Sequence, residues 1–167
     1  MTRSVFTRRR ILTAGIVLVA GGAAIAAGGG RNLFYDWLTE ETRATAIDPA
    51  MAHSQSLAGE ITLIDIRRPE EWAQTGSGEG AVRLDMRRKD FIAALDQIVD
   101  GDRAQPVALI CARGVRSARM SNLLAAAGFT QIIDVPEGMF GSGAGPGWLR
   151  RGLPLDRSPV APADRGT

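Results

Sequence analysis

Short apolar segments alternate with helical segments from residue 49 to residue 135, and this alternation is the strongest constraint on the fold. Residues 107–110, Val-Ala-Leu-Ile, form a continuous apolar run typical of a strand buried on both faces. Strands separated by helices at this spacing predict an α/β domain with a central, mostly parallel sheet flanked by helices in three layers. The predicted strands are residues 61–66, 81–84, 107–110 and 131–135, and the predicted helices are residues 49–57, a segment from Pro69, residues 90–99 and residues 117–127.

The predicted helices carry recognisable start signals. Pro49 follows Asp48, and Pro69 precedes two acids, so both segments favour a helix with proline in the first turn. Ser117 is expected to cap the helix after residues 107–110, and Gly128 is expected to end it. The side chains expected on the inner face of that helix are Met120, Leu123, Leu124 and Ala127.

Residues 1–27 resemble an export signal. Four arginines and no acid stand in the first ten residues, and residues 11–27 are weakly apolar. Residues 7–13, Thr-Arg-Arg-Arg-Ile-Leu-Thr, resemble the bacterial twin-arginine signal, with a small-residue cleavage site ending at Ala26. We therefore expect a periplasmic or other extracytoplasmic location, with residues 1–27 either cleaved as a signal peptide or retained as a membrane anchor helix.

The remaining chain divides into a linker at residues 28–47, a domain at residues 48–157 and a flexible tail at residues 158–167. Within the linker, residues 33–38, Leu-Phe-Tyr-Asp-Trp-Leu, could rest on a membrane surface or pack on the domain. Packing on the domain is the preferred interpretation. Without residues 1–26 the chain has 16 basic and 18 acidic residues, which gives no electrostatic case for nucleic-acid binding.

The chemistry concentrates in the segment Cys111-Ala112-Arg113-Gly114-Val115-Arg116, which joins the strand at 107–110 to the next helix. In parallel α/β folds, ligands collect at the carboxyl ends of strands. Two guanidinium groups, a helix N-terminus and a tight loop of amides all favour the thiolate and can hold an anion. This is the only cysteine, so the chain has no intramolecular disulfide and no resolving thiol.

The pattern Cys111-x-x-Gly-x-Arg-Ser117 resembles the active loop of single-domain rhodaneses. Residues 63–72, Leu-Ile-Asp-Ile-Arg-Arg-Pro-Glu-Glu-Trp, are similar to the early signature of that family, and residues 80–82 to its glycine-alanine pair. Residues 135–139, Val-Pro-Glu-Gly-Met, resemble its C-terminal pattern, which continues in Trp148 and Gly152-Leu153-Pro154. The resemblance covers roughly residues 48–157.

The resemblance implies a rhodanese-like fold and a sulfurtransferase in which Cys111 carries a persulfide. Arg113 and Arg116 would hold the oxygens of an anionic donor such as thiosulfate, and the amides of Arg113, Gly114, Val115 and Arg116 would stabilise sulfur anions. The acceptor would be cyanide, a small thiol or a partner protein. Asp65, Arg67 and Ser117 are interpreted as structural support of the loop. We expect a monomer that needs no cofactor and no metal.

Three segments depart from the pattern of the family or extend it. Ala112 stands where many members carry arginine after the cysteine, and Arg113 could supply that charge. Residues 76–79 replace the usual histidine-isoleucine-proline turn. The glycine-rich segment at 140–147 could line the pocket or form a flexible surface turn.

Two other function classes use similar features. Cysteine-dependent phosphatases and arsenate reductases place five residues between cysteine and arginine, whereas Cys111 and Arg116 have four between them. A non-enzymatic binding module on the same fold would not need an intact cysteine and two loop arginines. Both alternatives therefore rank below the sulfurtransferase.

Overall fold

The computed structural model describes residues 34, 35 and 37–159. The predicted signal or anchor at residues 1–27 lies outside these residues, as does most of the predicted tail. Within the described residues, no helix is both long and apolar enough to cross a bilayer.

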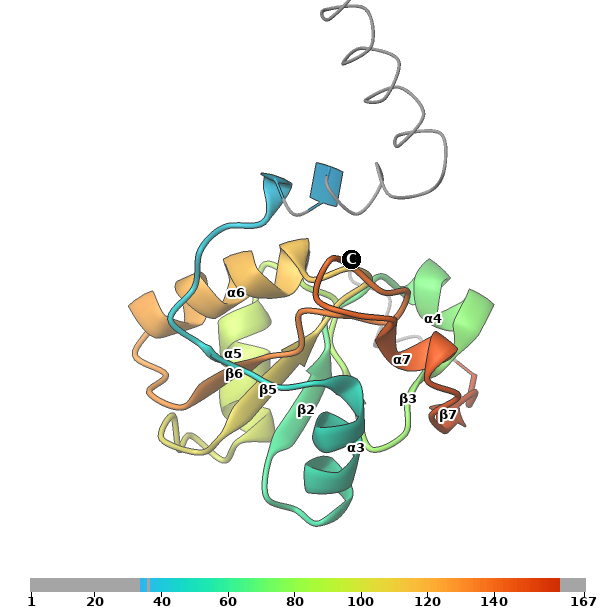
Figure 1. Ribbon diagram of the computed structural model, residues 1–167. Helices are drawn as coiled ribbons and strands as arrows, with labels where there is room; N and C mark the ends of the chain where they lie inside the picture. Colours follow the sequence, from blue (N-terminus) through green and yellow to red (C-terminus); the bar gives the residue numbers. More distant parts are fainter. Residues whose placement is uncertain (1–33, 36, 160–167) are drawn as a thin grey trace, which may run out of the picture.

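The domain is built on a five-stranded parallel sheet with the strand order β1-β6-β5-β2-β4 (Figure 1). This confirms the predicted α/β architecture and its parallel sheet. A second, two-stranded sheet pairs β3 with β7 in antiparallel fashion. The strands are β1 Thr45–Ala46, β2 Thr62–Asp65, β3 Ser77–Gly78, β4 Val82–Arg83, β5 Val107–Ile110, β6 Ile132–Asp134 and β7 Leu155–Asp156.

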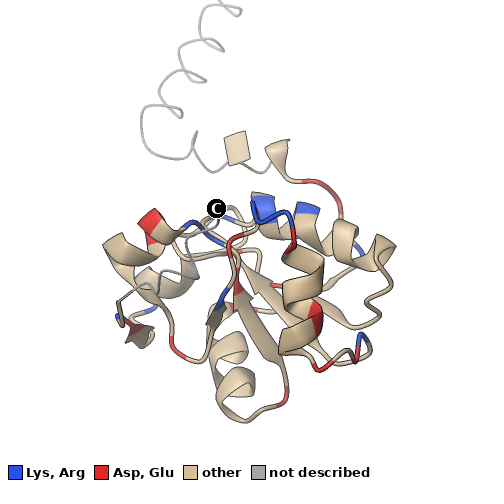
Figure 2. Ribbon diagram, turned by 180° about the vertical axis from the view of Figure 1, so that it is seen from behind, with Lys and Arg blue, Asp and Glu red and all other residues tan. Residues whose placement is uncertain are grey.

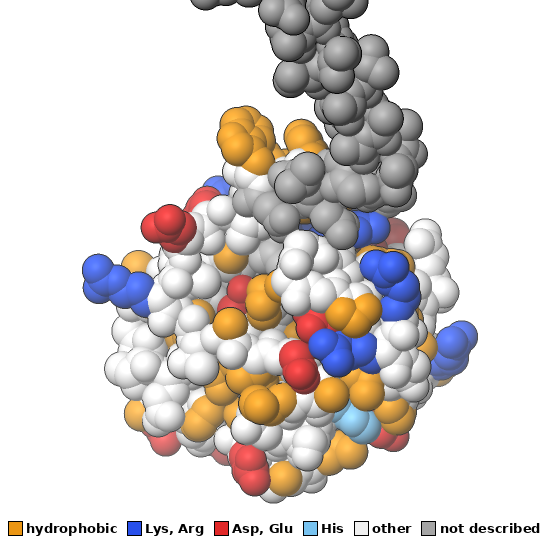
Figure 3. All heavy atoms as spheres, in the orientation of Figure 1, with side chains coloured by type: hydrophobic (Ala, Val, Ile, Leu, Met, Phe, Trp, Pro, Cys, Tyr) orange, Lys and Arg blue, Asp and Glu red, His pale blue; other side chains and the backbone are white. Residues whose placement is uncertain are grey.

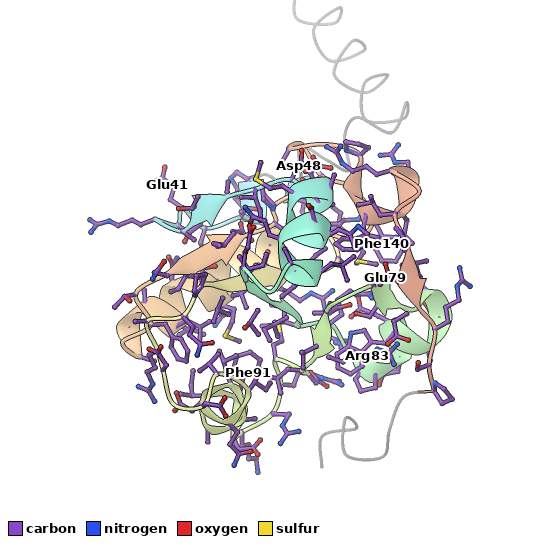
Figure 4. The ribbon with its side chains drawn as sticks, turned by 90° about the horizontal axis from the view of Figure 1, so that it is seen from below. Glu41, Asp48, Glu79, Arg83, Phe91 and Phe140 are labelled. Carbon is purple, nitrogen blue, oxygen red and sulfur yellow. The ribbon has the colours of Figure 1, made fainter. Side chains whose placement is uncertain are left out.

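Helices cover both faces of the main sheet. In Figure 1, α3 lies in front of the sheet, and α5 and α6 lie behind it. Figure 4 gives the same arrangement from below, with Asp48 at the start of α3 and Phe91 of α5 on opposite sides of the view. The helices are α3 Pro49–Leu57, α4 Pro69–Thr75, α5 Phe91–Ile98, α6 Val115–Ala126 and α7 Gly147–Arg150.

The two sides of the sheet bury separate apolar cores. Alternate side chains of β5 enter opposite cores, so Leu109 packs on the α5 and α6 side and Ile110 on the α3 and α7 side. All four side chains of β5 are fully buried. Burial of each of the three larger side chains, Val107, Leu109 and Ile110, stabilises the fold by about 1.5–3 kcal/mol, which makes β5 a rigid base for the loop that follows it.

The predicted helix starts at Pro49 and Pro69 are confirmed. Asp48 caps α3, because its side chain accepts a hydrogen bond of 2.8 Å from the backbone N–H of Met51. At α4 the carboxylate of Glu71 accepts a 3.1 Å hydrogen bond from the backbone N–H of Arg68. This bond fixes the position of Glu71, whose carboxylate also accepts hydrogen bonds from Arg116.

Two predictions about α6 were wrong. The helix begins at Val115 and Gly114 occupies its cap position, so Ser117 lies inside the first turn and is not the cap. Leu123, expected on the inner face, is 51% exposed. The inner face instead follows steps of three and four residues from Ser117 through Met120 and Ser121 to Leu124, which leaves Leu123 outside the stripe. Its buried members are Ser117, Ala118, Met120, Ser121 and Leu124.

The sheet also begins earlier than the sequence indicated. β1 lies within the segment assigned to the linker and pairs with β6, with Ala46 opposite Asp134. Two-residue strands carry too little apolar pattern to be recognised from sequence. As a result, this part of the predicted linker is tied to the domain, and the carbonyl of Glu41 accepts a 3.0 Å hydrogen bond from Asn122 of α6.

Candidate active site

Cys111 lies directly after the last residue of β5, at the carboxyl end of the parallel sheet. Its side chain is 1% exposed and belongs to the apolar core on the α5 and α6 side. The loop then runs through residues 112–114 into α6. A rigid buried strand therefore holds the thiol, and a helix N-terminus follows it.

Two glycines allow the loop to pack tightly. Gly114 has φ +86°, and a Cβ at this position would overlap the carbonyl oxygen of Pro136. Gly138 has φ +62°, and a Cβ there would lie 2.6 Å from the carbonyl carbon and oxygen of Ala112. Both positions require glycine, because other side chains rarely adopt this backbone conformation and would collide with backbone.

Backbone bonds from the neighbouring segment hold the loop carbonyls. The N–H of Met139 donates to the carbonyl of Cys111, and the N–H of Phe140 donates to that of Ala112, both at 2.9 Å. By contrast, the N–H groups of residues 112–116 donate to no acceptor in the described part of the chain. The loop thus offers donors to an incoming anion, as the nest interpretation requires.

Ser117 fixes the loop from inside. Its hydroxyl donates to the carbonyl of Gly114 at 3.0 Å and accepts from the thiol of Cys111 at 3.6 Å. The side chain is fully buried. It therefore orients the cysteine and stabilises the turn, in a position where it cannot cap the helix.

Arg116 forms a bidentate pair with Glu71 of α4, with two nitrogen–oxygen distances of 2.7 Å. Burial opposes the charged form of Arg116, but the Glu71 hydrogen bonds and the charge of the Cys111 thiolate outweigh it and raise the pKa of Arg116. Burial likewise opposes ionisation of Glu71, and bonds from Arg116 and the Arg68 backbone outweigh it and lower the pKa of Glu71. The pair is charged and lies beside the thiol.

Arg113 is oriented by two contacts from outside the loop. Its Nη1 donates to the carbonyl of Gly141 at 3.0 Å, and its guanidinium carbon lies 5.1 Å from the centre of the Tyr35 ring. The glycine-rich segment therefore lines the site through Gly141 and Phe140. Neither contact neutralises Arg113, so its charge remains available.

Asp65 and Arg67 form a separate, fully buried pair with a closest distance of 2.7 Å. Arg67 also donates to Thr75 and to the carbonyl of Gly76, and Ser77 donates to Asp65. These bonds tie the end of β2 to the end of α4. Neither side chain lines the cavity at Cys111.

A cavity of about 580 Å³ opens above Cys111. Three arginines and one glutamate line it, an excess of two positive charges before the thiolate is counted. Figure 2 shows blue segments at the upper end of the domain, beside the N-terminal segment. The lining residues are Tyr35, Leu38, Arg68, Glu71, Cys111, Ala112, Arg113, Val115, Arg116 and Phe140. Two cavities of about 630 and 680 Å³ lie elsewhere and do not include Cys111.

The sequence interpretation missed four of these residues: Tyr35, Leu38, Arg68 and Glu71. Glu71 was recognised only as a helix-start acid, although the same acid faces the loop arginine. Arg68 follows Arg67 directly, and no local signal distinguishes the arginine that enters the core from the one that lines the cavity. Arg68 forms no ion pair with a carboxylate among the described residues.

Asp134, the last residue of β6, is a buried carboxylate behind the loop. It is 3% exposed, and one of its oxygens has no hydrogen-bond partner in the described residues. Burial raises the pKa of Asp134 to about 6. The sequence interpretation assigned this residue no role.

The sequence signature of the rhodanese-like domain matches residues 48–142, which include Cys111 and both loop arginines. The chain belongs to the rhodanese family. The predicted family membership is confirmed.

Solved structures agree with this membership. A polysulfide-sulfur transferase homodimer from Wolinella succinogenes is 25% identical to this chain, with a TM-score of 0.52. The match covers 83% of this chain and 93% of that protein. The Rv0390 protein from M. tuberculosis is 26% identical to this chain, with a TM-score of 0.55. The match covers 69% of this chain and 98% of that protein.

A third similar structure shares the fold alone. It is the RPA3614 protein from Rhodopseudomonas palustris, described as a possible tyrosine phosphatase, with 21% identity and a TM-score of 0.50. The match covers 73% of this chain and 90% of that protein. The rhodanese fold is therefore shared with a protein for which another chemistry is named, and the site must decide the function.

Proposed function

We propose that this rhodanese-family protein is a sulfurtransferase that carries sulfane sulfur on Cys111 as a persulfide. The observation that supports the proposal best is the surroundings of the thiol. The only cysteine of the chain lies at the base of a cationic cavity, and it adjoins the amides of residues 112–116, which have no acceptor among the described residues. Such a site suits a thiolate that reacts with an anion.

In the first half-reaction, the Cys111 thiolate attacks the outer sulfur of a donor such as thiosulfate. A bond forms between the two sulfurs, the sulfur–sulfur bond of the donor breaks, and sulfite leaves with the bonding electron pair. Arg113 and Arg116 attract the donor oxygens, and amides of the loop from Arg113 to Arg116 stabilise the negative sulfur. No electrons enter or leave overall.

In the second half-reaction, an external nucleophile removes the outer sulfur of the persulfide. Cyanide would leave as thiocyanate and regenerate the Cys111 thiolate, and a small thiol or a partner protein could take the sulfur in the same way. Asp65, Arg67 and Ser117 keep the loop in place and do not touch the reacting sulfur donor. The reaction needs no metal and no cofactor.

Intact-mass measurement of the purified chain after thiosulfate treatment tests the proposal. We expect the mass of one added sulfur atom, lost again when cyanide is added, because each half-reaction changes the protein by one sulfur. Cys111→Ser should gain none. A native mass that does not change with thiosulfate, polysulfide or a thiosulfonate would overturn the proposal.

Hydrolysis of an aryl phosphate is the contrasting assay. Four residues separate Cys111 from Arg116, which makes the loop shorter than that of cysteine-dependent phosphatases, and we expect no Cys111-dependent hydrolysis. Phosphate release that is abolished in Cys111→Ser, without persulfide formation, would favour the phosphatase class.

We further propose that residues 1–27 direct the chain out of the cytoplasm. The support is the sequence of residues 7–13 and the apolar run that follows. Replacing Arg8 and Arg9 by lysine should leave the protein in the cytoplasmic fraction. The N-terminal sequence of the exported protein then distinguishes cleavage after Ala26 from a retained membrane tether.

A further inference from the structure

The cavity above Cys111 has one wall that the family match does not include. Tyr35 and Leu38 line it, and both lie before residue 48, where the match begins. Hydrophobic side chains project at the upper end of Figure 3, next to the grey residues, and the exposed apolar residues of this segment are Phe34, Trp37 and Leu38. The wall therefore lies outside the matched family domain.

This segment is held against the domain at several points. The Tyr35 ring lies under the Arg113 guanidinium at 5.1 Å, and Thr39 donates to the carbonyl of Tyr35 at 2.8 Å. Asn122 of α6 donates to the carbonyl of Glu41 at 3.0 Å. The pairing of β1 with β6 fixes the chain a few residues later. Tyr35 thus has a defined place beside the active loop.

The added wall changes what the cavity can hold. Its volume of about 580 Å³ falls in the range of roughly 300–1,000 Å³ that is typical of sites for organic ligands. Inorganic thiosulfate has five heavy atoms and would fill a small part of it. Tyr35, Leu38 and Phe140 give one side of the cavity apolar and aromatic surface, and the arginines give the other side positive charge.

We infer that the donor for Cys111 is an organic sulfane-sulfur compound, with an anionic sulfur group at the loop and an apolar body against Tyr35 and Leu38. The inference rests on the proposed sulfur transfer and names the substrate class for it. Tyr35 and Leu38 are then specificity-determining residues. Their apolar surface favours an apolar substituent, since its transfer from water to the wall is favourable.

A thiosulfonate serves as the probe. The Cys111 thiolate attacks its outer sulfur, the sulfur–sulfur bond breaks, and an organic sulfinate leaves with the electron pair. Benzenethiosulfonate carries an aromatic body, and methanethiosulfonate carries the same reactive group with a methyl. Because the two differ in intrinsic reactivity, each rate is divided by that of the same compound with a free small thiol.

With the full chain, we expect the normalised kcat/KM to be about tenfold higher for benzenethiosulfonate than for methanethiosulfonate. Tyr35→Ala combined with Leu38→Ala should reduce that ratio to about one, and Tyr35→Phe should retain it because the ring remains. Trp37→Ala is the matched control. Trp37 lies in the same segment and is 80% exposed, but it does not line the cavity, so both rates should stay unchanged.

Arg68→Gln separates charge from apolar contact. Both probes are anions, so loss of this positive charge should raise KM for both by a similar factor, about twofold to fivefold, and leave their ratio unchanged. A ratio near one in the native chain, or a ratio that the Tyr35 and Leu38 variants do not alter, would overturn the inference. Failure of every donor to form a persulfide would instead overturn the proposed function.

Discussion

The carboxyl ends of β2 and β5 lie next to each other in the sheet, and each is followed by an arginine that pairs with a carboxylate. The Asp65–Arg67 pair after β2 is 0% exposed, and the Glu71–Arg116 pair near the end of β5 is 24–26% exposed. Both pairs are bidentate, so the difference between them lies in burial and in further partners.

The remaining partners of each arginine show how the two pairs differ in role. Arg67 donates to Thr75 and Gly76 as well as to Asp65, so each of its three side-chain nitrogens has a partner inside the protein. Arg116 donates to Glu71 and lines the cavity at Cys111. A fully buried pair holds two segments together, whereas a partly exposed pair keeps charge close to a ligand. The same two chemical groups thus serve as scaffold in one place and as part of the site in the other.

Arg67→Met should give the largest effect and tests the scaffold half of this comparison. The substitution leaves the Asp65 carboxylate buried without its counter-charge, which should destabilise the fold by about 3–5 kcal/mol. Urea unfolding followed by circular dichroism measures the change.

The matched control for that prediction is Arg88→Met. Arg88 pairs with Asp90, a residue whose side chain is 60% exposed, and we expect a much smaller loss of stability than in Arg67→Met. Equal losses in the two variants would mean that burial does not distinguish the pairs.

Asp134→Asn tests burial separately from ion pairing, because Asp134 is buried and forms no ion pair with another described residue. Burial raises its pKa to about 6 in the folded chain, above the unfolded value of about 4, so the unfolded state ionises first as pH rises. The free energy of unfolding therefore falls as the pH rises from about 4 to about 6. Above pH 6 the total loss due to Asp134 is about 2–3 kcal/mol.

In Asp134→Asn this loss should disappear, so the variant should be more stable than the native chain at pH 7 and about equal to it at pH 4. Urea midpoints at a series of pH values measure this. Parallel pH profiles for the two proteins would show that Asp134 does not titrate in this way.

Glu71→Gln should give the smallest change in stability and tests the site half of the comparison. Removing a partly exposed partner should cost about 1 kcal/mol or less. The Arg116 charge is then no longer neutralised, so KM for thiosulfate should fall, by about threefold, in steady-state assays of thiocyanate formation.

Glu70→Gln is the control for that variant, since Glu70 is 67% exposed and its one ion pair within the described residues is with Arg87, at 3.8 Å. Its KM should match that of the native chain. A rise in KM in Glu71→Gln would mean that Glu71 is needed to position Arg116, and that its neutralising charge matters less.

The candidate site was partly predictable because its central part is local. Cys111, Arg113, Gly114 and Arg116 lie within one loop, and the strand before it has an unmistakable apolar run. The helix starts at Pro49 and Pro69 were likewise encoded within a few residues. The predicted roles of the loop residues in catalysis stay predictions.

The sequence by itself therefore determined the alternation of strands and helices, the parallel sheet and the place of the thiol at a strand end. These follow from periodicity, capping and chain connectivity, which act over short distances. The tertiary structure decided which charges meet: Arg116 with Glu71, which lies 45 residues away, and Arg113 with Tyr35 from outside the family match. It also decided that Leu123 faces outward and that the carboxylate of Asp134 is buried. Such contacts depend on how distant segments cross and in which register they pair, and no local pattern carries that information.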